Sequence, residues 1–158
     1  MTPRFNYYGF VNERGGEVNR GYTQIFRNGC LEATFADLIR ERNGARLISG
    51  FALEQKIVEA LPNYISGLRA LGVPPPLVVL LTLEGIGGVE YFVSRDNFDS
   101  NPPLPENTLK LPECVLQDFG SDAEHQEIVR PALDTLWNSI GYSRDQFFNA
   151  AGHWQGPQ

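Results

Sequence analysis

The sequence predicts an α+β domain: an antiparallel sheet with a long, kinked helix on one face and a second helix near the C-terminus. Three observations support this class. An Asn-Gly pair separates two strand-like runs, apolar residues recur at helical spacing from Phe51 to Leu71, and glycines separate a continuous apolar run from a further strand-like run. Together these features predict a strand–strand–helix–strand–strand core.

Composition narrows the function classes. The 158 residues are 42% hydrophobic and 20% charged, which suits a single domain, 1–158. The 13 basic and 19 acidic side chains give a net charge of −6. Direct contact with nucleic acid or an anionic membrane is therefore not expected, because both need clustered Lys and Arg. No signal peptide or membrane-spanning run is evident, so we expect a cytoplasmic protein, with Cys30 and Cys114 as free thiols.

Residues 1–20 are expected to form an irregular entry segment, with an extended piece near Tyr7 to Val11. Asn28-Gly29 then predicts a hairpin with a type I′ turn, whose two central residues both need positive φ. This turn would place Arg27 opposite Cys30. A mostly apolar face would then meet the core, formed by Tyr22, Gln24, Phe26, Leu31, Ala33 and Phe35.

Arg27 has two interpretations. It lies on the second face of the expected hairpin together with Glu32, which favours a cross-strand ion pair between them. The alternative is a recognition loop with Arg27 at its tip. The residues favour the ion pair.

A short helical turn and a bend at Asn43-Gly44 are expected next. The clearest helix runs from about Phe51 to Leu71, with one apolar face formed by Leu53, Ile57, Leu61, Tyr64, Leu68 and Leu71. Pro62 lies inside this pattern and cannot donate a backbone hydrogen bond, which predicts a kink or a division into two helices.

The apolar run from Leu77 to Leu83 predicts a central strand that is covered on both faces. Gly85, Gly87 and Gly88 form a turn into a strand from Val89 to Val93. A Pro-rich loop, 95–108, precedes a strand that Pro112 places at a sheet edge. The C-terminal helix and aromatic tail occupy 123–158, with the helix ending near Ile140 and the tail folding back onto the body; Pro131 inside the helix pattern would also fit a start near Val129.

No catalytic residue, cofactor or metal site is predicted. His125 and His153 have no second histidine or cysteine at ligand spacing. The segment GIGGVE lacks Gly-Lys-Ser/Thr and precedes a strand, so it is interpreted as a turn and not a phosphate loop. Trp137 and Trp154 are either core residues or anchors of an interface or ligand pocket. The ligand or interface candidates are Arg27, Glu32, Trp137 and Trp154.

Three segments carry a family resemblance: YTQIFRNGCLEA, LEQKIVEALPNYISGLRALGVPPPLVVLLTLEGIGG and VRPALDTLWNSIGYSRDQFFNAAGHW. They resemble the C-terminal region of bacterial proteins described as ATP-binding or helix-turn-helix proteins with an N-terminal Schlafen-type, AlbA-like domain assigned to DNA binding. The resemblance extends from about Gly21 to Trp154. The AlbA-like domain has no counterpart here, so its activity cannot be transferred, and the chain is either a fragment or a free-standing module.

Two functional hypotheses follow. The resemblance implies a non-catalytic interaction or sensor domain, an accessory module in regulation or defence that pairs with a protein partner or with itself, or responds to a ligand. The alternative is a small enzyme or small-molecule-binding domain with a site near Arg27, Glu32 and Glu84. An exposed apolar patch would favour the first, and a deep pocket with convergent charged groups would favour the second.

Overall fold

The computed structural model describes residues 2–13, 20–93 and 101–156. The predicted α+β class is confirmed, with mostly antiparallel strand pairs, a kinked long helix and a C-terminal helix. In chain order the elements are β1 (Thr2–Asn6), β2 (Gly9–Glu13), β3 (Gly21–Phe26), β4 (Leu31–Phe35), β5 (Ile39–Arg42), β6 (Ala45–Ser49), α1 (Gly50–Ala70), β7 (Leu77–Val79), β8 (Thr82–Glu84), β9 (Glu90–Phe92), β10 (Thr108–Lys110), β11 (Cys114–Leu116) and α2 (Asp122–Asn138).

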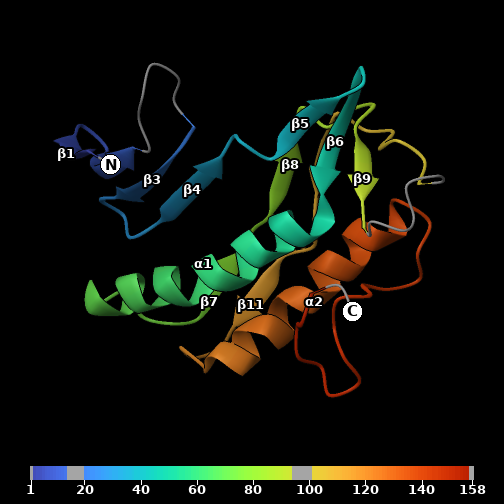
Figure 1. Ribbon diagram of the computed structural model, residues 1–158. Helices are drawn as coiled ribbons and strands as arrows, with labels where there is room; N and C mark the ends of the chain where they lie inside the picture. The colour runs from blue at the N-terminus through green and yellow to red at the C-terminus, as the bar shows by residue number, and fades with distance from the viewer. Residues whose placement is uncertain (1, 14–19, 94–100, 157–158) are drawn as a thin grey trace.

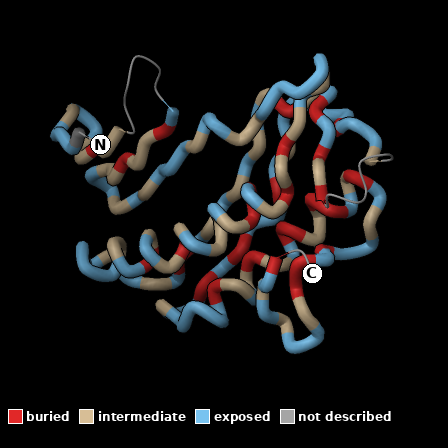
Figure 2. The backbone as a smooth tube through the Cα atoms, in the orientation of Figure 1, coloured by how far each residue is buried: buried red, intermediate tan, exposed pale blue. Residues whose placement is uncertain are grey.

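The first four strands form an antiparallel meander, in the order β1-β2-β3-β4, that lies to one side of the remaining chain, called here the body (Figure 1). The irregular entry expected over residues 1–20 is wrong where the structure describes it. β1 and β2 form a hairpin around Tyr7-Tyr8, and residues 14–19 lie outside the described chain. The main core begins only at Ile48, so most of the meander backbone is exposed or half-buried (Figure 2).

The β3–β4 hairpin is present, but its predicted turn type and register are wrong. Phe26, rather than Arg27, pairs with Cys30: its amide lies 2.8 Å from the Cys30 carbonyl oxygen. The loop therefore has three residues, and within it only Gly29 has positive φ, +86°, as in a type I turn closed by a glycine bulge. The Asn28 side chain stabilises this form, because its Oδ1 accepts a hydrogen bond from the Cys30 amide at 3.0 Å.

The change of register rearranges the two faces of the hairpin. Residues that lie opposite each other share a face, so Gln24 lies with Glu32, and Ile25 lies with Leu31. The expected apolar face does not form as a unit, and none of its members belongs to the main core. Gln24 is the buried one among them.

The second Asn-Gly pair forms the turn expected of the first. β5 and β6 pair as a hairpin, where a helical turn and a bend were expected. Asn43 and Gly44 have φ values of +52° and +80°, the positive pair that a two-residue type I′ turn requires. β6 also pairs with β9, and this pair is parallel because α1 and two further strands form a crossover between them.

α1 is one continuous helix through Pro62, so the alternative of two helices is not observed. The Ser49 side chain begins it by accepting a hydrogen bond from the Ala52 amide at 3.3 Å. Its inward face buries Leu53, Leu61 and Ile65. α1 packs against α2, which is also continuous through its own internal proline.

The prediction of a central strand from Leu77 to Leu83, covered on both faces, is wrong. The segment forms β7 and β8, which pair with β11 and β10 respectively. We call these four strands the ribbon. Its inner side packs on the core through residues such as Leu77, whereas Val78 and Leu80 are 56% and 70% exposed.

The aromatic tail folds back onto the body, as predicted. Phe147 and Phe148 are buried in the same core as α2, and Trp154 packs against it. Both cysteines are free, with Cys30 exposed and Cys114 buried. α2 contributes the most completely buried side chains, including Leu133, Leu136 and Trp137.

Candidate functional site

The structure places the four predicted candidates in two regions. Arg27 and Glu32 belong to the meander, whereas Trp137 and Trp154 meet in the body. Glu84, the third member of the alternative site, ends β8 opposite Thr108 in the ribbon. Arg27, Glu32 and Glu84 therefore lie on separate elements and do not form one pocket among the described residues.

The first region is an exposed aromatic surface at one end of the meander, called here the aromatic tip: Tyr7, Tyr8, Phe26 and Arg27. Tyr7 and Tyr8 are 87% and 61% exposed. Phe5 is also exposed, but it lies with Phe10 on the opposite face of the meander from Phe26. The rings contact one another edge to face, with centroids 5.3 Å apart for Tyr7–Tyr8 and 6.4 Å apart for Tyr8–Phe26. A shallow hollow lies between these residues and Asn28.

Arg27 joins the two turns that form the aromatic tip. Its backbone amide donates to the Tyr8 carbonyl at 3.0 Å, and its Nε donates to the Tyr7 carbonyl at 3.1 Å. The expected ion pair with Glu32 is not among the contacts of the described residues. Arg4 and Arg20 do have acidic partners, Glu13 and Asp37, so Arg27 differs from them in that no carboxylate neutralises its guanidinium in the described chain.

Glu32 lies on exposed β4 and acts on Tyr22. Burial raises the pKa of the Tyr22 hydroxyl, and the charge of Glu32 and its hydrogen bond raise that pKa further. Glu32 is thus a neighbour of a tyrosine rather than part of the aromatic tip.

The second region is centred on Glu54, a fully buried carboxyl group on α1. Its Oε1 accepts hydrogen bonds from the Trp137 indole at 2.7 Å and from the Tyr91 hydroxyl at 3.1 Å. Its Oε2 accepts from the Trp154 indole at 2.8 Å. One side chain thus ties α1 to β9, α2 and the tail, and the two predicted tryptophans meet on it.

A second buried carboxyl group, Asp145, lies beside Glu54. Burial, followed by the charge and hydrogen bond of Asp145, raises the pKa of Glu54 to about 8. Asp145 Oδ1 accepts from the Phe147 amide at 2.7 Å, while its buried Oδ2 has no partner if both groups are ionised. A proton held by Glu54 and donated to Asp145 satisfies that oxygen, so at neutral pH the pair carries one proton.

Aromatic rings seal this carboxyl pair. Phe51 stacks on Trp154 with centroids 5.5 Å apart, and Phe147 and Tyr142 each contact Trp137 edge to face at 5.1 Å. Neither the hollow at the aromatic tip nor the hollow beside the Asn43-Gly44 turn is lined by Glu54. The arrangement can stabilise the body and fix the tail, but it offers no opening for a substrate.

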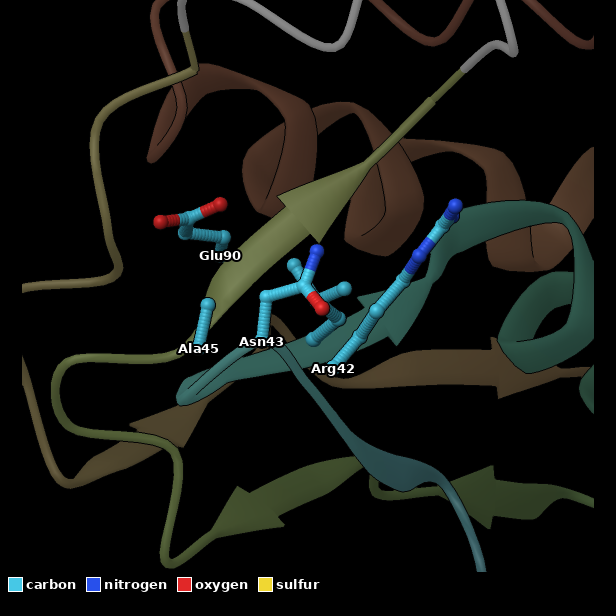
Figure 3. A pocket seen from close by; sticks show the side chains of 5 residues that line it. Arg42, Asn43, Ala45 and Glu90 are labelled. Atoms are coloured by element: carbon cyan, nitrogen blue, oxygen red, sulfur yellow. The ribbon is translucent and has the colours of Figure 1, made fainter.

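A second hollow lies beside the Asn43-Gly44 turn and is lined by Arg42, Asn43, Ala45, Leu47 and Glu90. Figure 3 shows the Arg42 and Glu90 side chains extending in different directions rather than toward a common point. It therefore lacks the convergent charges of a catalytic site.

Sequence reasoning missed Glu54, Asp145 and the exposed tyrosines. Glu54 had a signal: it precedes buried Leu61 by seven residues and therefore lies on the apolar face of α1. Tyr7 and Tyr8 had only their aromatic character, and Asp145 lies in an irregular tail with no periodicity to place it.

The chain was compared with protein-family models, curated proteins and solved structures, and none of the three comparisons gave a match. Within the described residues, no cluster of three or more His, Cys, Asp or Glu side chains could hold a metal ion. None of the described helices combines the length and apolar character needed to cross a membrane.

Proposed function

We propose that this chain is a non-catalytic interaction domain, an accessory module that regulates an effector by binding a protein partner through the aromatic tip. The carrying observation is the exposure of Tyr7 and Tyr8, whose rings contact each other at one end of a four-stranded sheet. Large contiguous aromatic surfaces are rare on isolated soluble domains and mark sites of contact. Tyrosine is also among the residues that contribute most to binding energy at protein interfaces.

Arg27 adds polar specificity to this surface. Its Nε donates to the Tyr7 carbonyl and its backbone amide donates to the Tyr8 carbonyl, and these bonds hold Arg27 at the turn that carries the two tyrosines. Since no carboxylate of the described chain neutralises it, a carboxylate of the partner is the natural counterpart. A partner with apolar and acidic side chains fits both properties.

Catalysis has less support. The charged residues of the alternative site lie on separate elements, and the most strongly perturbed carboxyl group, Glu54, is sealed from solvent. A catalytic acid or base must reach its substrate. The Glu54–Asp145 pair therefore supports the module's structure in this proposal.

The test is photo-crosslinking in cells that naturally contain the chain. A benzophenone amino acid replaces Tyr7 in one variant and Asp122 in the matched control, whose side chain is 83% exposed at the start of α2. We expect a discrete crosslinked polypeptide from position 7 and none from position 122. Equal labelling at both positions, or none at either, would remove the support for an interaction surface at the aromatic tip.

A further inference from the structure

The ribbon has a second exposed apolar surface, called here the ribbon patch: Val78, Leu80 and Val115. Their exposed fractions are 56%, 70% and 39%. Val78 and Val115 lie directly opposite each other in the β7–β11 pair, so their side chains share the outer face. The run from Leu77 to Leu83 is apolar on both sides, which is typical of a strand covered on both faces. Within the described part of the chain only the inner face is covered.

We propose that a second copy of this chain covers the ribbon patch with its aromatic tip, and that the contact is reciprocal, giving a closed two-fold dimer. This inference rests on the proposed function and names the partner. Among the described residues seven large hydrophobic side chains are highly exposed, and five of them belong to one of these two surfaces. No part of the described chain covers either surface, and a second copy supplies both covers at once.

The area agrees with a stable dimer. Tyr7 and Tyr8, with exposed fractions of 87% and 61%, present roughly 300 Å² per copy, since fully burying one such ring removes roughly 150–250 Å² from water. If the ribbon patch loses a similar area, two reciprocal contacts counted on both partners bury roughly 1,200 Å², the lower end of the range of specific interfaces. The ribbon patch paired with itself would bury about half of that area, because it makes one contact instead of two.

The charges around the aromatic tip and the ribbon patch are also complementary. Residues 1–35, which include the meander, carry four basic and three acidic side chains, whereas residues 36–158 carry nine basic and sixteen acidic ones. Exposed Glu113 lies two residues before Val115, and exposed Glu84 ends β8. Lys110 is the basic residue on the same stretch of ribbon. The excess of acidic groups favours approach of the un-neutralised Arg27 of a second copy.

Symmetry makes the contact self-limiting. A tip-to-ribbon contact used once per chain would leave a free tip and a free patch and would extend into an open filament. When the same two copies make the contact twice, both surfaces are used and the assembly closes. We therefore expect a dimer and no larger species.

The experiment measures the mass of the assembly by sedimentation velocity at chain concentrations from about 1 to 200 μM. An interface of this kind should change from monomer to dimer within this range. The tip variant carries Tyr7→Ser and Tyr8→Ser, and the ribbon variant carries Val78→Ser and Leu80→Ser. Each should weaken dimerisation about 100-fold or more. The matched control is Leu71→Ser, which removes an exposed large hydrophobic side chain outside both surfaces and should leave the dimer unchanged.

Mixing the two variants distinguishes this dimer from others. The tip variant still has an intact ribbon patch, and the ribbon variant still has an intact tip, so a one-to-one mixture should form a heterodimer with one of its two contacts, in contrast to either variant alone. Circular dichroism checks that each variant folds. Val115→Lys tests the same patch from the neighbouring strand if the ribbon variant does not fold.

Three outcomes overturn the inference: a wild-type chain that stays monomeric, a tip variant that dimerises like the wild type, or mass that keeps growing with concentration. A monomeric chain that still crosslinks from position 7 to a different polypeptide in cells would end the dimer proposal and leave the interaction function standing. Loss of that crosslink would end both.

Discussion

The meander and the body both enclose buried polar side chains, but among the described residues only those of the body can ionise: Gln24 lies in the meander, and Glu54, Asp145 and His125 lie in the body. In the meander, Gln24 is 5% exposed. Its Nε2 donates to the carbonyls of Phe10 and Ile25 at 3.2 and 3.0 Å, and its Oε1 accepts from Asn6 at 2.7 Å. In the body, Glu54 accepts from two indoles and one phenol and lies beside Asp145.

The surroundings of the two groups differ as much as their chemistry. Val11 is the buried hydrophobic residue among the described meander residues, whereas the body buries a continuous apolar cluster from Ile48 to Phe148. The meander is thus held mainly by strand pairing and a neutral amide, and the body by apolar burial around a protonated carboxyl group. This difference favours a stable body, whose stability depends on a bound proton, and a less stable sheet, which carries the surface that we propose for recognition.

Replacing Glu54 by Leu is expected to cause the largest loss in the stability of the body. Leucine leaves the Trp137 and Trp154 indoles and the Tyr91 hydroxyl without an acceptor, and we expect the free energy of unfolding to fall by about 3–5 kcal/mol. Glu54→Gln is the matched control. It keeps one acceptor oxygen and should cost about 1 kcal/mol, because only one indole loses its partner. Urea denaturation at pH 6 measures both, and equal losses would show that the hydrogen bonds do not matter.

The pH dependence of the free energy of unfolding is a second test of the carboxyl pair in the body. The folded-state pKa of Glu54 is about 8, above its ordinary 4.5, so between these values the unfolded chain has released a proton that the folded chain still holds. The stability that Glu54 contributes is therefore fully present below pH 4.5 and is lost as pH rises toward 8, by about 2–4 kcal/mol. The pKa of Asp145 is also raised, first by burial and then by the charge of Asp134, although the charge of Arg130 lowers it. Loss of the Asp145 proton therefore also reduces stability as pH rises.

Unfolding measured at a series of pH values checks this slope. Glu54→Gln cannot release the proton, so its profile should be distinctly flatter, with a residual slope from Asp145. A wild-type stability that rises from pH 5 to pH 8 would contradict the protonated pair.

The two hairpins show where sequence reasoning succeeds and fails. An Asn-Gly pair between strand-like runs correctly placed a hairpin at Asn28-Gly29, but the turn type followed contacts that the dipeptide does not contain. The Asn28 side chain binds the Cys30 amide, and Gly29 packs against Val73, 3.2 Å from the position its Cβ would take. At Gly44 no atom of the described chain, apart from its sequence neighbours, lies within 4 Å of the position that a Cβ would take, and Asn43-Gly44 adopts the intrinsic type I′ form.

Apolar periodicity predicted where the helices lie, but it did not predict the sites. Both helices were located from apolar spacing, since that spacing reports burial directly. The run at Leu77 was placed on a doubly covered strand because its composition demands cover, yet no part of the described chain covers Val78 or Leu80. The Glu54–Asp145 pair joins residues far apart in sequence, and only tertiary structure brings Asp145 to Glu54. The tryptophans were identified as candidates, but their common acceptor was not.

The smallest expected effect concerns Gln24. Gln24→Ala removes three hydrogen bonds inside the meander and should cost that sheet about 1–2 kcal/mol, independent of pH because an amide does not titrate. Amide hydrogen exchange can assign the loss: faster exchange is expected in β1–β4 and unchanged exchange in α2, whose residues belong to the separate core. Gln24→Met is the matched control for volume, since it fills the space without the hydrogen bonds. If α2 also exchanged faster in Gln24→Ala, the meander and the body would unfold as one unit, and the distinction between a recognition sheet and an independent core would not hold.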